Sequence, residues 1–195
     1  MSQVRLSNAD FLNTVLGDKG QLPDYLLLPH EQAQVRAAHN ENVTEFQKIV
    51  ESKVSVTGGD DWHDGAFRTT DNEARVAAER NAAIAPFLGA VIVEYPLPQE
   101  VRVTIGSRVF VEQKSYTFPV DIVGFRQGYP SGVVDKETGE EIIGISPDSP
   151  LGQAILGKET GESTEYRNGE RIFQAIIARI DQEAVRSQFA ELLED

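Results

Sequence analysis

The sequence has no cysteine, so neither a disulfide framework nor thiolate chemistry is available to it. It also has no apolar run near the roughly 18 residues that a membrane-spanning helix needs. The first residues, MSQVRLSNADFL, lack the basic segment and apolar stretch of an export signal. We therefore expect a cytoplasmic protein with no membrane partner.

Positive charge is scarce as well. The chain has 18 Lys and Arg against 31 Asp and Glu, a formal net charge of −13. Because tight binding to a nucleic-acid backbone needs clustered Lys and Arg, we expect no direct binding to double-stranded DNA. An acidic protein is instead steered toward basic surfaces or metal ions.

What is present predicts an α+β protein of four blocks. Residues 1–29 form a short leader that ends in LPDYLLLP, and residues 30–92 are rich in helix formers. Residues 97–180 alternate or run apolar between Gly, Pro and Asn turns, which predicts strands. Residues 181–195 carry apolar side chains at helical spacing, and this amphipathic tail packs either on its own domain or on a partner.

Within residues 30–92, side chains recur at alternating steps of three and four, the pattern of a coiled-coil seam. We therefore expect an antiparallel hairpin of two helices whose arms of about 28 residues reach ~42 Å. Asn81 in this seam is expected to pair with His39 and to fix the register. The seam consists of His39, Val43, Phe46 and Val50 before the acidic segment, and Phe67, Thr70, Ala74, Ala77, Asn81, Ile84 and Leu88 after it.

The hairpin turn, residues 58–65 (GGDDWHDG), holds three carboxylates, those of Asp60, Asp61 and Asp64. Like charges this close need either open solvent or a cation. One interpretation is a solvated turn that caps a helix, since Asp is favoured at helix N-termini. The other is a metal-binding tip, because Mg²⁺ takes one or two carboxylates and a pair spaced i, i+3 lies on one side of a helix.

The segment SPLGQAILGK predicts a short helix with Ser149 as N-cap, Pro150 in the first helical position and Gly157 as its end. Part of it, GQAILGKE, matches most of a phosphate-binding loop. However, Glu159 occupies the position of the magnesium-binding hydroxyl, and the Gly-Lys pair lies at a helix end whose dipole repels phosphate. We therefore do not expect an ATP site.

The run IGISPDSPLGQAILGKETGESTEYRNGERIFQAIIARI resembles the C-terminal half of the bacterial GreA/GreB transcript-cleavage factors. RVTIGSRVFV and YTFPVDIVG resemble the strands that precede it there, and the hairpin resembles the family's N-terminal coiled coil. The resemblance covers about residues 25–180. It implies an FKBP-like domain at 97–180 that docks at the rim of RNA polymerase's secondary channel, and a coiled coil that reaches the polymerase active site.

The resemblance also implies roles for individual residues. Asp61 and Asp64 match the Asp and Glu that share the polymerase's second catalytic Mg²⁺ and so act on the RNA 3′ end indirectly, with Asp60 as an accessory acid. The protein would then be no enzyme itself and would hold no cofactor of its own. The docking face implied at the short helix comprises Ser149, Pro150, Leu151, Ile155 and Lys158.

This sequence departs from the family at the tip and along the coil. Asp64 is one methylene shorter than Glu, and a positioning error near 1 Å costs about 100-fold in rate. The family's basic patch on the coil has no clear counterpart, since residues 31–57 contain only Arg36, Lys48 and Lys53 against four glutamates. We therefore expect modulation of elongation without strong cleavage, as in inhibitory homologues with extra acids at the tip.

Two other functions remain open. The second domain is a candidate prolyl isomerase, for which Tyr116, Phe118, Phe125 and Tyr129 are the candidate aromatic lining. Alternatively, the chain is an acidic coiled-coil adaptor with no polymerase role.

Overall fold

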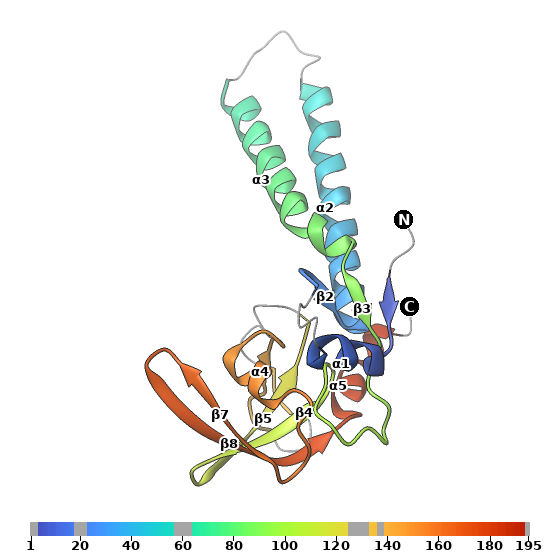
Figure 1. The fold of residues 1–195 in the computed structure, drawn as a ribbon. Helices are drawn as coiled ribbons and strands as arrows, with labels where there is room; N and C mark the ends of the chain where they lie inside the picture. The colour runs from blue at the N-terminus through green and yellow to red at the C-terminus, as the bar shows by residue number, and fades with distance from the viewer. Residues whose placement is uncertain (1–3, 18–22, 57–63, 125–132, 136–138, 194–195) are drawn as a thin grey trace. The chain divides into compact units, whose positions relative to one another are not determined.

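The computed structural model describes residues 4–17, 23–56, 64–124, 133–135 and 139–193. It is an α+β structure, as the sequence predicts, with two compact units (Figure 1). Unit 1 comprises Met1–Gln32 and Ala90–Asp195, and unit 2 comprises Ala33–Gly89. No helix in the described part of the chain is both long and apolar enough to cross a membrane.

Two long helices provide unit 2. Helix α2 (Pro29–Val56) begins in unit 1 and α3 (Asp64–Leu88) follows it. The two run side by side in opposite directions (Figure 1). An ion pair of 3.3 Å between Arg80 Nη1 and Glu45 Oε2 joins them. The predicted helices on both sides of the acidic segment are therefore present.

Burial along α2 and α3 follows most of the predicted seam. The positions that are buried or half-buried are His39, Val43, Phe46, Thr70, Ala74, Ala77, Asn81 and Ile84. The prediction is wrong at Val50 and Leu88, which are 41% and 37% exposed. Ile49, one residue before Val50, is half-buried in its place.

The predicted bond between His39 and Asn81 is also wrong. His39 Nδ1 and Asn81 Oδ1 are both buried, but neither has a hydrogen-bond partner. Spacing along the two helices places both residues in the seam correctly. It does not determine whether their polar atoms come within bonding distance.

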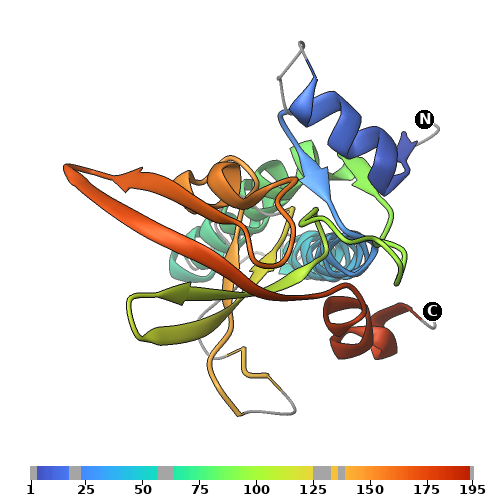
Figure 2. The ribbon, with the colours of Figure 1, turned by 60° about the horizontal axis from the view of Figure 1, so that its bottom comes forward.

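A five-stranded sheet forms the centre of unit 1, in the order β6-β5-β4-β8-β7. Its strands are antiparallel neighbours except for β5 and β6, which are parallel. Figure 2 shows the long β7–β8 hairpin, in orange, extending from this sheet. The bounds are β4 (Arg108–Gln113), β5 (Tyr116–Ile122), β6 (Ile143–Ile145), β7 (Ser163–Asn168) and β8 (Arg171–Asp181).

The leader contributes to unit 1. Its strands β1 (Arg5–Leu6) and β2 (Leu26–Leu27) pair in parallel with β3 (Val91–Val93), one on each side. Along the chain, α1 (Asn8–Leu16) connects β1 to β2. Its N-cap Ser7 accepts a hydrogen bond from the Asp10 amide at 3.1 Å. The Asn8 side chain donates to the carbonyl oxygens of Glu94 and Ile105 at 2.8 and 3.0 Å. These bonds fasten α1 to the rest of the unit.

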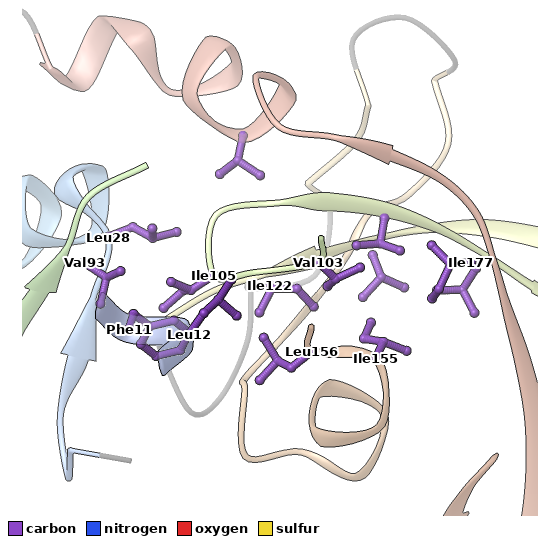
Figure 3. Close-up of a cluster of buried hydrophobic side chains, with 14 of the residues drawn as sticks. Phe11, Leu12, Leu28, Val93, Val103, Ile105, Ile122, Ile155, Leu156 and Ile177 are labelled. Atoms are coloured by element: carbon purple, nitrogen blue, oxygen red, sulfur yellow. The ribbon is translucent and has the colours of Figure 1, made fainter. Parts of the chain in front are cut away.

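The hydrophobic core of unit 1 draws on α1 and on the strands β2, β3, β4, β5 and β8. Figure 3 shows Phe11 and Leu12 from α1 facing Ile105, with Ile155 and Leu156 on the other side of the cluster. All five of these side chains are at most 6% exposed. Burying side chains of this size stabilises the fold by about 1.5–3 kcal/mol each.

Short helices complete the unit. Helix α4 (Pro150–Ile155) has the predicted N-cap, since Ser149 Oγ accepts from the Gly152 amide at 3.1 Å. Gly157 follows in the left-handed region at φ +75° and ends the helix as predicted.

The tail forms α5 (Ala184–Gln188) and a 3₁₀ turn (Ala190–Leu193). Val185 is 0% exposed, and Phe189 packs against the core. These two contacts support the alternative in which the tail packs on its own domain.

Candidate functional site

The acidic segment joins the distal ends of α2 and α3 along the chain. Helix α2 ends at Val56 and α3 begins at Asp64. Asp60 and Asp61 lie outside the described residues, and so does the side chain of Asp64. Within the part that the structure describes, no three His, Asp or Glu side chains gather as a metal-ligand set. The metal-binding role of these aspartates therefore stays a prediction.

Charge on the described surfaces of α2 and α3 is paired rather than uniformly basic. Arg75 Nη1 lies 2.7 Å from Glu79 Oε1, and Arg80 lies 3.3 Å from Glu45. Both pairs are exposed, so each contributes at most about 1 kcal/mol to stability. They do, however, place a carboxylate next to each of these cations, which weakens the surface as a site for RNA phosphates.

The base of α2 is fastened by Glu31, which is 0% exposed. Its Oε2 accepts from the Leu28 amide at 2.6 Å, which is the reach-back bond of a capping box at the third helical position. The same carboxylate accepts from the Gly124 amide at 3.1 Å. One buried side chain thus connects the first turn of α2 to the chain just after β5.

This contact leaves no space for a side chain at position 124, so a glycine is required there. A Cβ on it would lie 2.4 Å from the Leu26 carbonyl oxygen and 2.6 Å from Glu31 Oε2. Only a residue without a side chain lets the backbone approach the carboxylate this closely.

His30, the residue before Glu31, stacks on the ring of Phe189 and lies edge to edge with Tyr95. Its ring centroid lies 4.1 Å from that of Phe189 in the tail and 6.0 Å from that of Tyr95. His30 Nδ1 and the Tyr95 hydroxyl are hydrogen-bonded at 2.7 Å, while His30 Nε2 is buried without a partner. Burial lowers the pKa of His30 to about 4 and raises the pKa of Tyr95. The imidazole is therefore neutral at pH 7.

Arg108 on β4 connects three further parts of unit 1. Its guanidinium holds Asp121 on β5 in two hydrogen bonds of 2.7 and 2.9 Å. It also donates to Asp135 and to the Gln188 side chain of α5. Arg108 is 4% exposed and Asp121 is 0% exposed. A buried Arg with bidentate geometry is well suited to such a network.

The predicted docking residues lie around α4 but are not equally accessible. Ser149 and Lys158 are half-buried and Pro150 is exposed, while Leu151 packs partly against the core. Lys158 Nζ lies 3.6 Å from Glu162 Oε1. Ile155 is 0% exposed, so in this structure it is a core residue and presents no surface for a partner.

The aromatic residues suggested for an isomerase are only partly described. Tyr116 and Phe118 stack with their centroids 6.1 Å apart, whereas Phe125 and Tyr129 lie outside the described residues. Tyr116 is 66% exposed, so the two rings border an open groove and do not line an enclosed pocket.

The structure adds three residues to those named from the sequence: Glu31, His30 and Arg108. Glu31 had only half of a capping-box signal, since it stands three positions after Leu28, but Leu28 lacks the Ser or Thr side chain of that motif. Neither His30 nor Arg108 had one. The hydrogen-bond partner of His30 is 65 residues away along the chain, and the partners of Arg108 are 13 or more residues away.

Comparison with known proteins identifies one region of the chain. Residues 98–182 match the family model "Transcription elongation factor, GreA/GreB, C-term". No curated protein sequence matches the chain.

Solved structures give weak overall likenesses. The GreA factor homolog 1 (Gfh1) of Thermus thermophilus is 18% identical and has a TM-score of 0.36, with 81% of this chain and 99% of that chain covered. Gfh1 of Thermus aquaticus is also 18% identical and has a TM-score of 0.36, with 82% of this chain and 99% of that chain covered. GreA/GreB from Nitrosomonas europaea is 23% identical with a TM-score of 0.30, covering 52% of this chain and 78% of that chain. These superpositions are too poor to establish a common fold.

The family match, in contrast, coincides with the part of unit 1 that contains the five-stranded sheet and α4. None of these findings favours the isomerase alternative. Residues 98–182, somewhat less than half of the chain, therefore match the C-terminal domain of the GreA/GreB transcription elongation factors.

Proposed function

We propose that the protein is a regulator of transcription elongation that binds the secondary channel of RNA polymerase. The observation that carries this proposal is the GreA/GreB C-terminal domain at residues 98–182. It is supported by the two long antiparallel helices that precede this domain, with three aspartates between them. In this proposal α2 and α3 form a coiled-coil finger and the C-terminal domain, FKBP-like in fold, docks at the channel rim.

The acidic segment is the part that acts at the polymerase active site. Carboxylates and waters are the ligands that Mg²⁺ prefers, so Asp61 and Asp64 suit a shared Mg²⁺, with Asp60 adding negative charge. A second metal ion at such a site stabilises the attacking and leaving oxygens of a phosphodiester. The polymerase supplies the catalytic centre, and this chain supplies only carboxylates.

Inhibition or modulation is a better fit to this chain than strong cleavage. Two basic residues of α3 stand beside glutamates, at 2.7 and 3.3 Å, and the net charge is −13. A surface of this kind holds extruded RNA poorly because phosphates need unpaired cations. An acidic tip that competes for the active-site Mg²⁺ needs no such surface.

The docking face is expected at α4 and comprises Ser149, Pro150, Leu151 and Lys158, without the buried Ile155. The test is binding of the full chain to purified bacterial RNA polymerase, measured by fluorescence anisotropy. We expect saturable binding that weakens in Lys158→Glu but not in Lys114→Glu, an exposed lysine at the β4–β5 turn. Absence of binding, or equal loss in both variants, would contradict the proposed dock.

A further inference from the structure

Strand β7 leaves one edge of the five-stranded sheet open. It is the last strand in the order β6-β5-β4-β8-β7, so among the described residues it has a neighbouring strand on one side only. Figures 1 and 2 both show the tip of the β7–β8 hairpin extending away from the rest of unit 1. The unpaired N–H and C=O groups of such an edge are a template for another strand. The proposed function, which uses α4 and the acidic segment, gives this edge no role.

Alternate residues of β7 direct their backbone groups to the open edge. The Ile177 amide of β8 donates to the Glu162 carbonyl oxygen at 2.9 Å. Because hydrogen-bonded pairs alternate with non-bonded pairs along an antiparallel ladder, the even-numbered residues of β7 bond to β8. The N–H and C=O groups of the odd-numbered residues Glu165 and Arg167 therefore point outward.

Glu165 and Arg167 also place opposite charges at this edge. They lie two positions apart, so their side chains are on the same face of the sheet, and both residues are exposed. Glu165 Oε1 accepts from the neutral Gln174 side chain at 3.1 Å, which leaves the carboxylate its charge. Arg167 forms no ion pair within the described part of the chain. Both charges are therefore available to an occupant of the edge.

This pattern of charges is complementary to a second copy of itself. In an antiparallel pair of β7 strands, outward-facing residues pair with outward-facing residues. With the two-fold axis at Tyr166, Glu165 of each copy lies opposite Arg167 of the other, and each of these pairs exchanges two backbone hydrogen bonds. Moving the axis by one residue places either Glu165 or Arg167 opposite its own copy, and like charges directly opposite each other are destabilising.

We propose that β7 pairs antiparallel with β7 of a second copy of this chain, with the two-fold axis at Tyr166. A foreign strand would match both the charges and the register only by coincidence, whereas symmetry supplies both matches to a second copy. Nothing in β7 blocks the pairing, because its sequence STEYRN has no proline or lysine and its register with β8 is unbroken from Ser163 to Asn168. Since a strand of 6 residues makes a small contact, the dimer is weak. It uses no residue of α4 and does not rest on polymerase binding.

Sedimentation equilibrium of the full chain over a concentration series tests the proposal. We expect a monomer–dimer equilibrium with a Kd below about 1 mM. Glu165→Arg and Arg167→Glu should each weaken the dimer at least about tenfold, since each change turns two opposite-charge pairs into like-charge pairs. Glu41→Arg and Lys48→Glu are the matched controls. They make the same changes in net charge at exposed positions of α2 and should leave the Kd nearly unchanged.

The charge swap decides the register. Glu165→Arg/Arg167→Glu restores both the opposite-charge pairs and the net charge, so this variant should dimerise about as tightly as the wild-type chain. An equimolar mixture of the two single variants should form heterodimers for the same reason. A swap variant as weak as either single variant, an equal loss in the controls, or a chain that stays monomeric up to about 1 mM would overturn the proposal, whichever other strand the edge then accepts.

Amide hydrogen exchange locates the contact. The Glu165 and Arg167 amides point outward and should gain protection as the protein concentration rises, whereas the Tyr166 amide bonds to β8 and should not change. Circular dichroism checks that every variant is folded, as the exposed positions predict. Dimerisation that protects other amides and leaves these two unchanged would assign the dimer to another surface and refute the pairing.

Discussion

Removing the Glu31 carboxylate should loosen the base of α2. Glu31→Ala deletes the acceptor for two buried amides, Leu28 at 2.6 Å and Gly124 at 3.1 Å. An unpaired buried donor costs about 1–3 kcal/mol, and hydrogen bonds to a charged group lie at the upper end of the range. We therefore expect the free energy of unfolding to fall by about 3–5 kcal/mol. Glu31→Gln keeps one acceptor oxygen and should cost about half as much.

Two measurements check this expectation. Urea unfolding followed by circular dichroism gives the change in the free energy of unfolding. Amide hydrogen exchange at Leu28 and Gly124 reports the same contact locally, and protection of both amides should fall. Glu41→Ala is the matched control, because Glu41 is exposed on the same helix and its loss should change stability by no more than about 0.5 kcal/mol.

Gly124→Ala tests the contact from the opposite side. The added Cβ would lie 2.4 Å from the Leu26 carbonyl oxygen and 2.6 Å from Glu31 Oε2, so the carboxylate must move. Because both changes act on one contact, the double variant should lose less than the sum of the single losses. Strict additivity, or a Glu31→Ala variant as stable as Glu41→Ala, would refute the reasoning.

Three further predictions concern other contacts. The folded pKa of His30, about 4, lies below its unfolded value of 6.5, so the unfolded state binds more protons between these values. Stability should rise with pH across that window and fall by about 3 kcal/mol on acidification through it, and His30→Phe should remove that part of the urea-midpoint profile. Arg108→Ala should cost about 3–5 kcal/mol because it removes a buried cation from beside the buried carboxylates of Asp121 and Asp135, with Arg108→Lys intermediate; a cost below about 1 kcal/mol would contradict the network. Ile155→Ala should lower unfolding free energy by about 2–5 kcal/mol yet leave polymerase affinity unchanged for the folded fraction, since the side chain is 0% exposed.

Elements defined by local chemistry could be predicted from the sequence. Helix α4 follows from Ser149, Pro150 and Gly157, which are neighbours in the chain and form its cap, first turn and stop. The strands β4, β5 and β8 follow from apolar alternation. Strand β7, with the sequence STEYRN, shows only a weak alternation because it lies at the edge of the sheet and its inner side consists of the half-buried Thr164 and Tyr166.

Features that depend on distant partners could not be predicted. The leader pairs with β3, about 65 residues or more further along the chain, and nothing in its short strands indicates that partner. The seam pattern correctly placed most buried positions of α2 and α3. It failed at Val50, because a three-four rhythm allows Ile49 the same role with a small rotation of the helix.

The residues of the candidate site also fall into those that the sequence could indicate and those that it could not. The sequence shows the three carboxylates of Asp60, Asp61 and Asp64, but the roles of Asp61 and Asp64, like that of Lys158 and its neighbours, come from a resemblance. The family match at residues 98–182 supports that resemblance for Lys158 and its neighbours. The bonds of Glu31 and Arg108, which hold the first turn of α2 and the tail within unit 1, required three-dimensional contacts. Stability is therefore the less predictable part of this molecule.

The most direct test of the central claim is RNA extension and RNA cleavage by stalled, backtracked bacterial polymerase complexes across a Mg²⁺ titration. The wild-type chain would be compared with Asp61→Ala/Asp64→Ala, and with Glu170→Gln as a surface control. The account predicts slower extension without faster cleavage, strongest at low Mg²⁺ and relieved by the double variant only. Faster cleavage that the double variant abolishes would instead identify a cleavage factor, and no effect of the wild-type chain on either reaction would contradict the polymerase role.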